Sequence, residues 1–204
     1  MKKFDVTIEN PFPFSKFSMK LYIKNMVCNR CIFAVENVLK QQNLTASTII
    51  LGEVVLEKQL SESEYNLLNI ALEDLGFEIL EDKKSQLMEH IKAIIIDLIQ
   101  NHNGVLQTNF STYLTEALKQ DYNYISNLFS DSEGITIEKY FIVQKIEKVK
   151  ELLAYDEMSL SEIAYQMDYS SVAYLSNQFK KVTGMTTTVF KNKSTTKRTA
   201  LDQL

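Results

Sequence analysis

The stretch that decides the fold is MSLSEIAYQMDYSSVAYLSNQFKKVTGMTTTVFK, residues 158–191. Its first part predicts a short helix, because Ser159 or Ser161 can serve as the N-cap and Glu162 can complete a capping box with Ser159. Apolar residues then recur at spacings that share one helical face, namely Ile163, Ala164 and Met167. The run Asp168-Tyr-Ser-Ser171 interrupts this pattern and predicts a turn.

A second helix with two different faces follows this turn. Leu175, Phe179 and Val182 recur at helical spacing and predict the face that packs on a core. The outward face is polar and basic, with Ser176, Asn177, Lys180 and Lys181. Gly184 predicts the end of the helix, because glycine adopts the left-handed conformation of a C′ residue without strain. Together these elements predict a helix-turn-helix, whose second helix can enter the major groove of DNA.

The same residues resemble the signature of AraC-type transcriptional regulators. The matching segments are Leu160–Tyr165, Tyr169-Ser170, Tyr174–Ser176 and Phe179–Gly184. Two positions depart from the family pattern, since Asp168 stands where the family usually has Gly and Thr187 where it usually has Pro. We expect the first change to alter the turn, and the second to loosen the start of the last helix, predicted over residues 187–191. The resemblance implies a DNA-binding transcription regulator.

The AraC resemblance covers about residues 86–193 and implies two helix-turn-helix units joined by one long helix. Apolar periodicity predicts a helix over residues 86–101, which Asn103-Gly104 closes. The first helix-turn-helix unit and the long helix follow, with predicted ranges 112–119, 122–129 and 136–155. These patterns predict an all-α module of about seven helices with two helix-turn-helix units.

The N-terminal part has a different pattern, in which strands and helices alternate. Strands are predicted over residues 20–26, 46–51, 54–60 and 77–80, and helices over 31–42 and 63–75. This βαββαβ order is the split pattern of α+β ferredoxin-like domains. The predicted organisation is a flexible lead-in (1–18), a ferredoxin-like domain (19–81), an AraC-like DNA-binding domain (82–193) and a basic flexible tail (194–204).

The only two cysteines of the chain lie in Met26-Val-Cys28-Asn-Arg-Cys31, between the first strand and the first helix. Thiolates at this spacing, on a loop that enters a helix, can both reach one soft ion. The helix dipole and the neighbouring Arg30 favour the thiolate form. The spacing therefore predicts a two-thiol metal site.

Residues 19–80 resemble the heavy-metal-associated domains of copper chaperones and metal-transporting ATPases. The resemblance implies that Cys28 and Cys31 are metal ligands, and it departs from the family at Asn25, usually Gly, and Val27, usually Thr or another polar residue. Two ligands suit Cu(I), which accepts low coordination, better than zinc, which requires four, and another soft metal ion is the alternative.

Two other interpretations of this domain stay open. It can be a vestigial metal domain retained for dimerisation or docking, or its CxxC motif can be redox-active. His90 and His102 lie outside the domain and are interpreted as incidental helix residues rather than ligands.

The charge of the chain is unevenly distributed. The net charge of −4 argues mildly against nucleic acid, but from residue 158 onward six basic residues outnumber three acidic ones, a local charge of +3. Phosphate binding needs such a local patch rather than a basic total. Arg30 and Arg198 are the only arginines, so the commonest specific contact, arginine to guanine, is almost absent and A·T-rich sites are favoured.

The composition argues against several other classes of protein. There is no run of about 18 apolar residues and no apolar signal-peptide core, so we expect a cytoplasmic protein with reduced cysteines and no membrane partner. The sequence contains no Gly-rich phosphate loop, no HExxH motif and no Ser/His/Asp order with supporting context. The carboxylates are scattered at helix-surface spacings, and we expect no enzyme.

The candidate DNA contacts lie on the second helix of each unit. In the second unit they are Ser171, Tyr174, Ser176, Asn177, Lys180 and Lys181. Asn177 can pair with adenine, whereas both lysines are expected at phosphates, and Tyr174 can instead pack against the protein. In the first unit the analogous positions are Asn123, Tyr124 and Asn127. Nearby Asp121, Asp131 and Glu133 repel phosphates, so this unit is expected to bind weakly or not at all.

The leading hypothesis is a transcription regulator that binds double-stranded DNA and responds to a soft metal ion such as Cu(I). Metal binding would order the Met26–Cys31 loop and shift domain docking or dimerisation, so a second copy of the chain is an open partner. The alternative is a metal-binding or metal-delivery protein with a helical interaction module and no DNA role.

Overall fold

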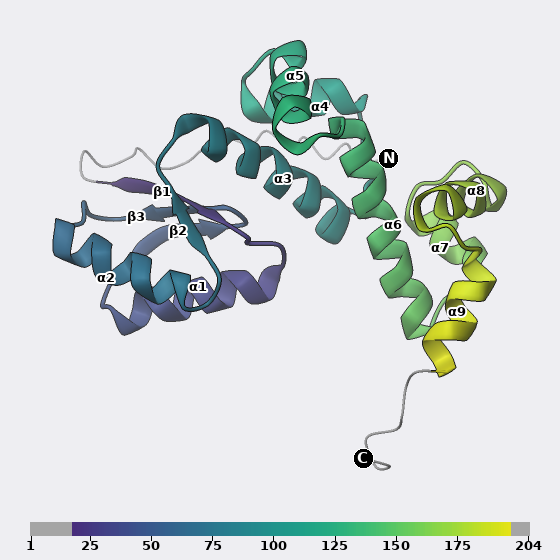
Figure 1. Ribbon diagram of the computed structural model, residues 1–204, viewed down its shortest axis with the longest axis horizontal. Coiled ribbons are helices and arrows are strands. Elements are labelled where there is room, and N and C mark those ends of the chain that lie inside the picture. Colours follow the sequence, from purple (N-terminus) through teal and green to yellow (C-terminus); the bar gives the residue numbers. More distant parts are fainter. Residues whose placement is uncertain (1–17, 197–204) are drawn as a thin grey trace, which may run out of the picture. The chain divides into compact units, whose positions relative to one another are not determined.

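The computed structural model describes residues 18–196, and the side chains of residues 18–192. Most of the predicted lead-in and of the predicted basic tail lies outside the described residues. The described residues divide into two compact units, one up to Glu81 and one from Asp82 (Figure 1).

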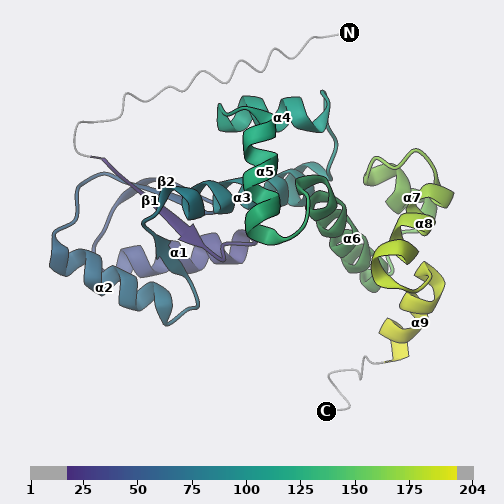
Figure 2. The ribbon, with the colours of Figure 1, turned by 45° about the horizontal axis from the view of Figure 1, so that its top comes forward.

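The N-terminal unit is a four-stranded antiparallel sheet with two helices. Its elements are β1 (Met19–Lys24), α1 (Asn29–Gln41), β2 (Ala46–Ile50), β3 (Glu53–Leu56), α2 (Glu62–Glu73) and β4 (Glu78–Leu80). The strand order is β2-β3-β1-β4, and every neighbouring pair is antiparallel. Both helices lie against one face of the sheet (Figure 1, Figure 2). The predicted order of strands and helices is therefore observed.

Burial of apolar stripes holds this unit together. Leu21 and Ile23 alternate with exposed or half-buried residues along β1, as the two-residue period of a strand requires. Each helix buries one stripe, formed by Val35, Val38 and Leu39 in α1 and by Leu68 and Leu72 in α2. These stripes form the core between the helices and the sheet.

Two strands end at least two residues earlier than the sequence pattern predicts. β1 stops before Asn25, whose φ of 71° is left-handed and turns the chain. The Asn25 Nδ2 donates a hydrogen bond of 2.9 Å to the carbonyl oxygen of Gly76, so this turn is attached to the segment that precedes β4. β3 stops at Leu56, because residues 57–60 bend toward Ser61, the N-cap of α2.

The C-terminal unit is helical throughout its described residues. Its seven helices are α3 (Lys83–His102), α4 (Phe110–Leu118), α5 (Tyr122–Glu133), α6 (Ile137–Tyr155), α7 (Leu160–Gln166), α8 (Val172–Thr183) and α9 (Thr187–Thr196). The long helix α6 contacts α3 and α5 as well as α7, α8 and α9. The pairs α4–α5 and α7–α8 therefore pack on one shared helix (Figure 2). Within residues 18–196, no helix has the length and apolar character needed to cross a membrane.

The core of this unit draws on all of its short helix pairs. Ile91, Ile95 and Ile99 follow one face of α3 and are buried against residues of α6 such as Ile146 and Val149. The predicted positions Ile163, Ala164, Met167, Leu175 and Phe179 are also buried in this cluster, and Val182 is partly buried against it. The helix-period patterns therefore identified the core correctly.

The stretch 158–191 folds with the predicted caps. Ser159 starts α7 with a capping box to Glu162, and Gly184 ends α8 with a φ of 75°. Asp168 has a φ of 52°, so it adopts the left-handed conformation that glycine would take at this position. Aspartate is among the residues that tolerate this conformation, and the turn is kept.

The last helix is longer than predicted. The Thr186 hydroxyl accepts a hydrogen bond of 3.3 Å from the Val189 amide, which caps the first turn. The helix then runs from Thr187 to Thr196 rather than ending at Lys191. A threonine cap therefore supports the start of this helix without the proline of the family pattern.

Candidate functional site

The exposed face of α8 carries both uncharged polar and basic side chains. Leu175 and Phe179 are fully buried on the opposite side, which fixes how the helix is rotated. The exposed residues are Ala173, Tyr174, Asn177, Lys180 and Lys181. Ser176 is half-buried at the edge of this face. Five of the six predicted contact residues of this unit are thus exposed, and the sequence interpretation missed Ala173, which lies four residues before Asn177.

The N-terminus of α8 is capped by the side chain of Ser171. Ser171 Oγ accepts a hydrogen bond of 3.1 Å from the Tyr174 amide. This bond occupies the Ser171 hydroxyl as a helix cap. The positive end of the helix dipole lies at the same place and favours a nearby anion such as a phosphate.

The turn between α7 and α8 is held on α6 by a buried lysine. The Lys145 ammonium lies 4.5 Å from the centroid of the Tyr169 ring, and the Tyr169 hydroxyl donates to Gln178 Oε1 at 2.7 Å. Burial lowers the pKa of Lys145, although Asp168 acts in the opposite direction. These contacts connect α6 to α8 and position the second helix-turn-helix unit, a role that no sequence motif indicated.

The first unit exposes a similar polar face. Asn123, Tyr124 and Asn127 of α5 are all exposed. Asp121 caps the helix, accepting from the amides of Asn123 and Tyr124 at 2.9 and 3.1 Å. Its carboxylate is therefore engaged at the N-terminus of α5.

Two further acids of the first unit were also predicted to repel phosphates. Glu133 forms an ion pair of 2.7 Å with Lys92, which offsets its charge. Asp131 is exposed, so its carboxylate lies on the surface of α5. The repulsion is thus more localised than the sequence suggested.

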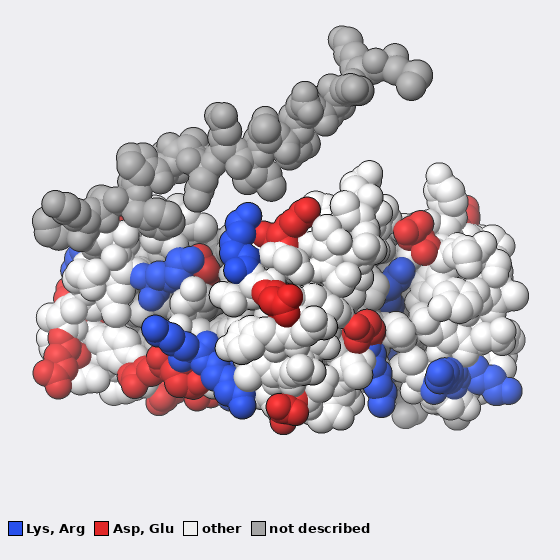
Figure 3. Space-filling view, turned by 90° about the horizontal axis from the view of Figure 1, so that it is seen from above, with Lys and Arg blue, Asp and Glu red and all other residues white. Residues whose placement is uncertain are grey.

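Charge is distributed in small groups over the surface. On the face drawn in Figure 3, lysine and carboxylate side chains are interspersed among large uncharged areas. Lys191 forms an ion pair with Asp156, so part of its charge is compensated within the protein. Lys180 and Lys181 are adjacent and both exposed, and they form a compact basic pair on α8.

The thiol loop precedes α1 in the N-terminal unit. Cys28 is the N-cap residue of α1, and its Sγ lies 3.7 Å from the Sγ of Cys31. Burial acts to raise the pKa of Cys28, but hydrogen bonds from Cys31 and the backbone amide and charge of Arg30 outweigh it, so the pKa is lowered. Both thiols are free and half-buried. The loop therefore favours a thiolate at Cys28.

The donor set of this loop fits a soft ion of low coordination number. Thiolates bind soft ions at about 2.3 Å, so sulfurs 3.7 Å apart are within reach of one ion. Met26 is buried, with 3% of its surface exposed, and belongs to the core rather than to the ligands. Among residues 18–196, no group of three or more His, Cys, Asp or Glu side chains could hold a metal. Cys28 and Cys31 are thus the candidate ligands, and His90 and His102 join no such group.

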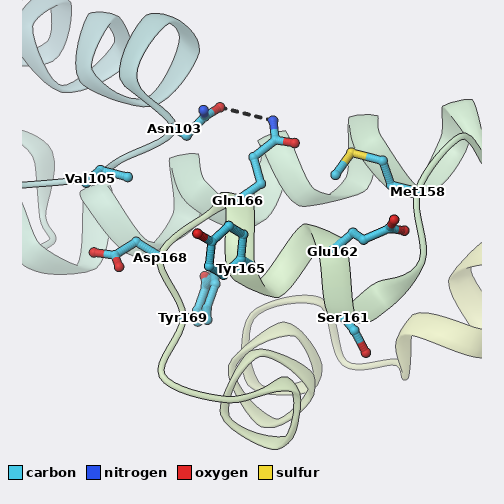
Figure 4. A pocket seen from close by; sticks show the side chains of 9 residues that line it. All are labelled: Asn103, Val105, Met158, Ser161, Glu162, Tyr165, Gln166, Asp168 and Tyr169. Carbon is cyan, nitrogen blue, oxygen red and sulfur yellow. Dashed lines mark hydrogen bonds between the residues drawn. The ribbon is translucent and has the colours of Figure 1, made fainter.

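A pocket of about 830 Å³ lies beside α7 in the C-terminal unit. Its lining comes from α7, from the residues on either side of α7 and from the segment after α3, and Gln166 Nε2 donates to Asn103 Oδ1 at 3.2 Å (Figure 4). Glu162 and Asp168 contribute carboxylates to the lining, whereas no lysine or arginine does. This acidic character disfavours phosphates, so we do not assign the pocket to the DNA interface.

Residues 114–193 match the protein family described as a helix-turn-helix domain. The matched residues include α5 to α8, and a helix-turn-helix of this kind is a DNA-binding module. No curated protein matches the sequence.

Three solved structures are similar to part of the chain. One is the C-terminal domain of AraT, a response regulator from Geobacillus stearothermophilus (23% identity, 55% of this chain and 88% of that chain, TM-score 0.47). Another is the C-terminal domain of the two-component response regulator yesN from Fusobacterium nucleatum (29% identity, 49% and 96%, TM-score 0.43). The third is a DNA-binding transcriptional dual regulator from Escherichia coli K-12 (17% identity, 53% and 95%, TM-score 0.46).

Proposed function

We propose that this protein is a transcription regulator of the AraC type, which binds specific double-stranded DNA through its C-terminal unit. The observation that carries the proposal is the exposed face of α8, where Tyr174 and Asn177 are followed by Lys180 and Lys181. The N-terminal part of a recognition helix contacts base edges, and lysines further along can neutralise phosphates. This helix lies within the matched helix-turn-helix domain.

The experiment that tests DNA binding removes the basic pair. We expect Lys180→Ala/Lys181→Ala to weaken binding to all duplexes and to flatten the slope of log K against log salt by about 1.8, since each phosphate contact contributes about 0.9. Fluorescence anisotropy titrations at several salt concentrations measure this slope. Lys83→Ala/Lys84→Ala removes the same charge from exposed positions of α3 and serves as the control. Absence of salt-dependent binding by the wild-type protein would reject the DNA role.

The N-terminal unit supplies a candidate signal for this regulator. We infer that it is a ferredoxin-like, heavy-metal-associated domain in which Cys28 and Cys31 bind a soft metal ion, with Cu(I) preferred. Support comes from the 3.7 Å separation of the two sulfurs, the lowered pKa of Cys28 and the β-α-β-β-α-β order of the unit. Asn25 supplies the left-handed turn before the loop, where the family usually has glycine. When bound, the ion would cross-link the two thiolates and restrict the loop.

The metal proposal has a test that does not depend on DNA. The full-length protein is titrated with Cu(I) under reducing conditions against a colorimetric chelator, beside Cys28→Ser/Cys31→Ser. One ion per chain, lost in the double variant, is the expected result. DNA titrations with and without Cu(I) then measure any coupling between the sites. Metal binding without DNA binding would favour the alternative, a metal-delivery protein with a helical interaction module.

A further inference from the structure

The two helix-turn-helix units of this chain repeat one structural pattern at a displacement of 50 residues. The first helices are capped by Asn109 and Ser159, and the second helices by Asp121 and Ser171. The second helices end in left-handed glycines, Gly134 and Gly184, and the next helices are capped by Thr136 and Thr186. The N-caps of the first and second helices, the glycine ends of the second helices and the caps of the next helices are therefore found at equivalent positions of both units.

The packing of the two second helices repeats as well. Phe129 of α5 lies edge-on to Tyr140 with ring centroids 5.4 Å apart, and Phe179 of α8 lies edge-on to Phe190 at 5.5 Å. The burial classes of residues 122–129 and 172–179 agree at all eight positions. Equivalent residues of α5 and α8 therefore point toward the core or toward solvent in the same way.

The outward positions carry the same two side chains. Tyr124 and Tyr174 are each 54% exposed, and Asn127 and Asn177 are both exposed three residues later. Asparagine can form two hydrogen bonds with adenine, at N6 and N7, in the major groove. On the basis of the proposed DNA-binding function, we propose that α5 and α8 both read adenine, through Asn127 and Asn177. The DNA site would then present the same adenine contact twice.

The residues that follow the two asparagines differ in charge between α5 and α8. Lys180 and Lys181 of α8 correspond to Ser130 and Asp131 of α5. The second unit therefore supplies phosphate affinity, whereas the first adds base discrimination with little electrostatic attraction. The first unit is a reader of low affinity rather than an inactive copy.

The test begins with selection of duplexes from a random library by the full-length protein, with and without Cu(I) under reducing conditions. Affinities for all single-base variants of the selected site are then measured for the wild type, Asn127→Ala and Asn177→Ala. Both substitutions place alanine at an exposed helical position, so they preserve the helix. Asn37→Ala, at an exposed position of α1, is the matched control.

Each asparagine variant should abolish discrimination, about tenfold or more, at one adenine and leave the other adenine unchanged. The control should alter neither position. Asn127→Ala could leave the affinities for all single-base variants unchanged, or remove discrimination at a position where the wild type prefers a base other than adenine. Either result would refute adenine reading by both helices while leaving the DNA-binding function in place. If no sequence is enriched and no salt-dependent binding is measured, the proposed function fails with it.

Discussion

Moving the basic pair of α8 onto α5 should strengthen DNA binding and steepen its dependence on salt. The variant Ser130→Lys/Asp131→Lys gives the first recognition helix the charges that the second has at Lys180 and Lys181. Asp131 is exposed, and although Ser130 is half-buried, the apolar stem of a lysine can extend along the surface and keep its ammonium in water. The change removes one repulsive charge and adds two attractive ones.

The expected magnitude follows from counterion release. If both new lysines neutralise a phosphate, the slope of log K against log salt becomes steeper by about 1.8. Between 50 and 200 mM salt, a fourfold range, the affinity advantage over the wild type then falls by a factor of about 12. The gain is therefore largest at low salt and declines as salt rises.

Anisotropy titrations of one labelled duplex at four or five salt concentrations measure both slopes. The control Asn66→Lys/Asp74→Lys makes the same change in net charge at exposed positions of the N-terminal unit. A slope that equals that of the wild type, or an equal change in the control, would refute the placement of α5 against DNA.

Three further predictions concern the thiol and the packing of the second unit. Because the pKa of Cys28 is lowered, more of this thiol is ionised at neutral pH. Alkylation of Cys28, followed by mass spectrometry, should therefore reach half its maximal rate at a lower pH in the folded protein than in urea. Equal midpoints in the two conditions would contradict this prediction. Phe179→Ala should reduce the free energy of unfolding by about 3–5 kcal/mol in denaturant titrations, whereas a loss below 1 kcal/mol would mean that the ring is not in the core. Gly184→Ala should reduce the free energy of unfolding by about 1–2 kcal/mol, because alanine is strained at the left-handed φ of this position. The added Cβ itself has room, since no atom beyond those of the adjacent residues lies within 4 Å of it. An unchanged unfolding midpoint would argue against that backbone conformation.

The sequence predicted best those features that local chemistry determines. Capping residues such as Ser159 and the alternation of apolar residues in α8 identified the ends and the buried faces of helices, because both depend on neighbours within one or two turns. Strand ends were less predictable. β1 ends at a turn fixed by a hydrogen bond from Asn25 to Gly76, 51 residues away, which no local pattern contains.

The candidate interface likewise combines features that local sequence predicts with features that depend on distant contacts. Helical period indicated most of the exposed face of α8, but not the role of Lys145, because α6 contains four lysines and nothing in the sequence distinguishes this one. Its position over the Tyr169 ring depends on the packing of α6 against the turn between α7 and α8. Contacts between distant segments must be seen in the structure.

Scarcity of arginine affects how such an interface could be regulated. Two exposed lysines on α8 contribute a small electrostatic attraction compared with sites that neutralise six to ten phosphates. Base contacts such as those proposed for Asn127 and Asn177 then account for a larger share of the binding free energy. When total affinity is modest, a change of about 1.4 kcal/mol alters occupancy up to tenfold. If the proposed metal site is coupled to the proposed DNA interface, a coupling free energy of this size on metal binding would change DNA occupancy by the same factor.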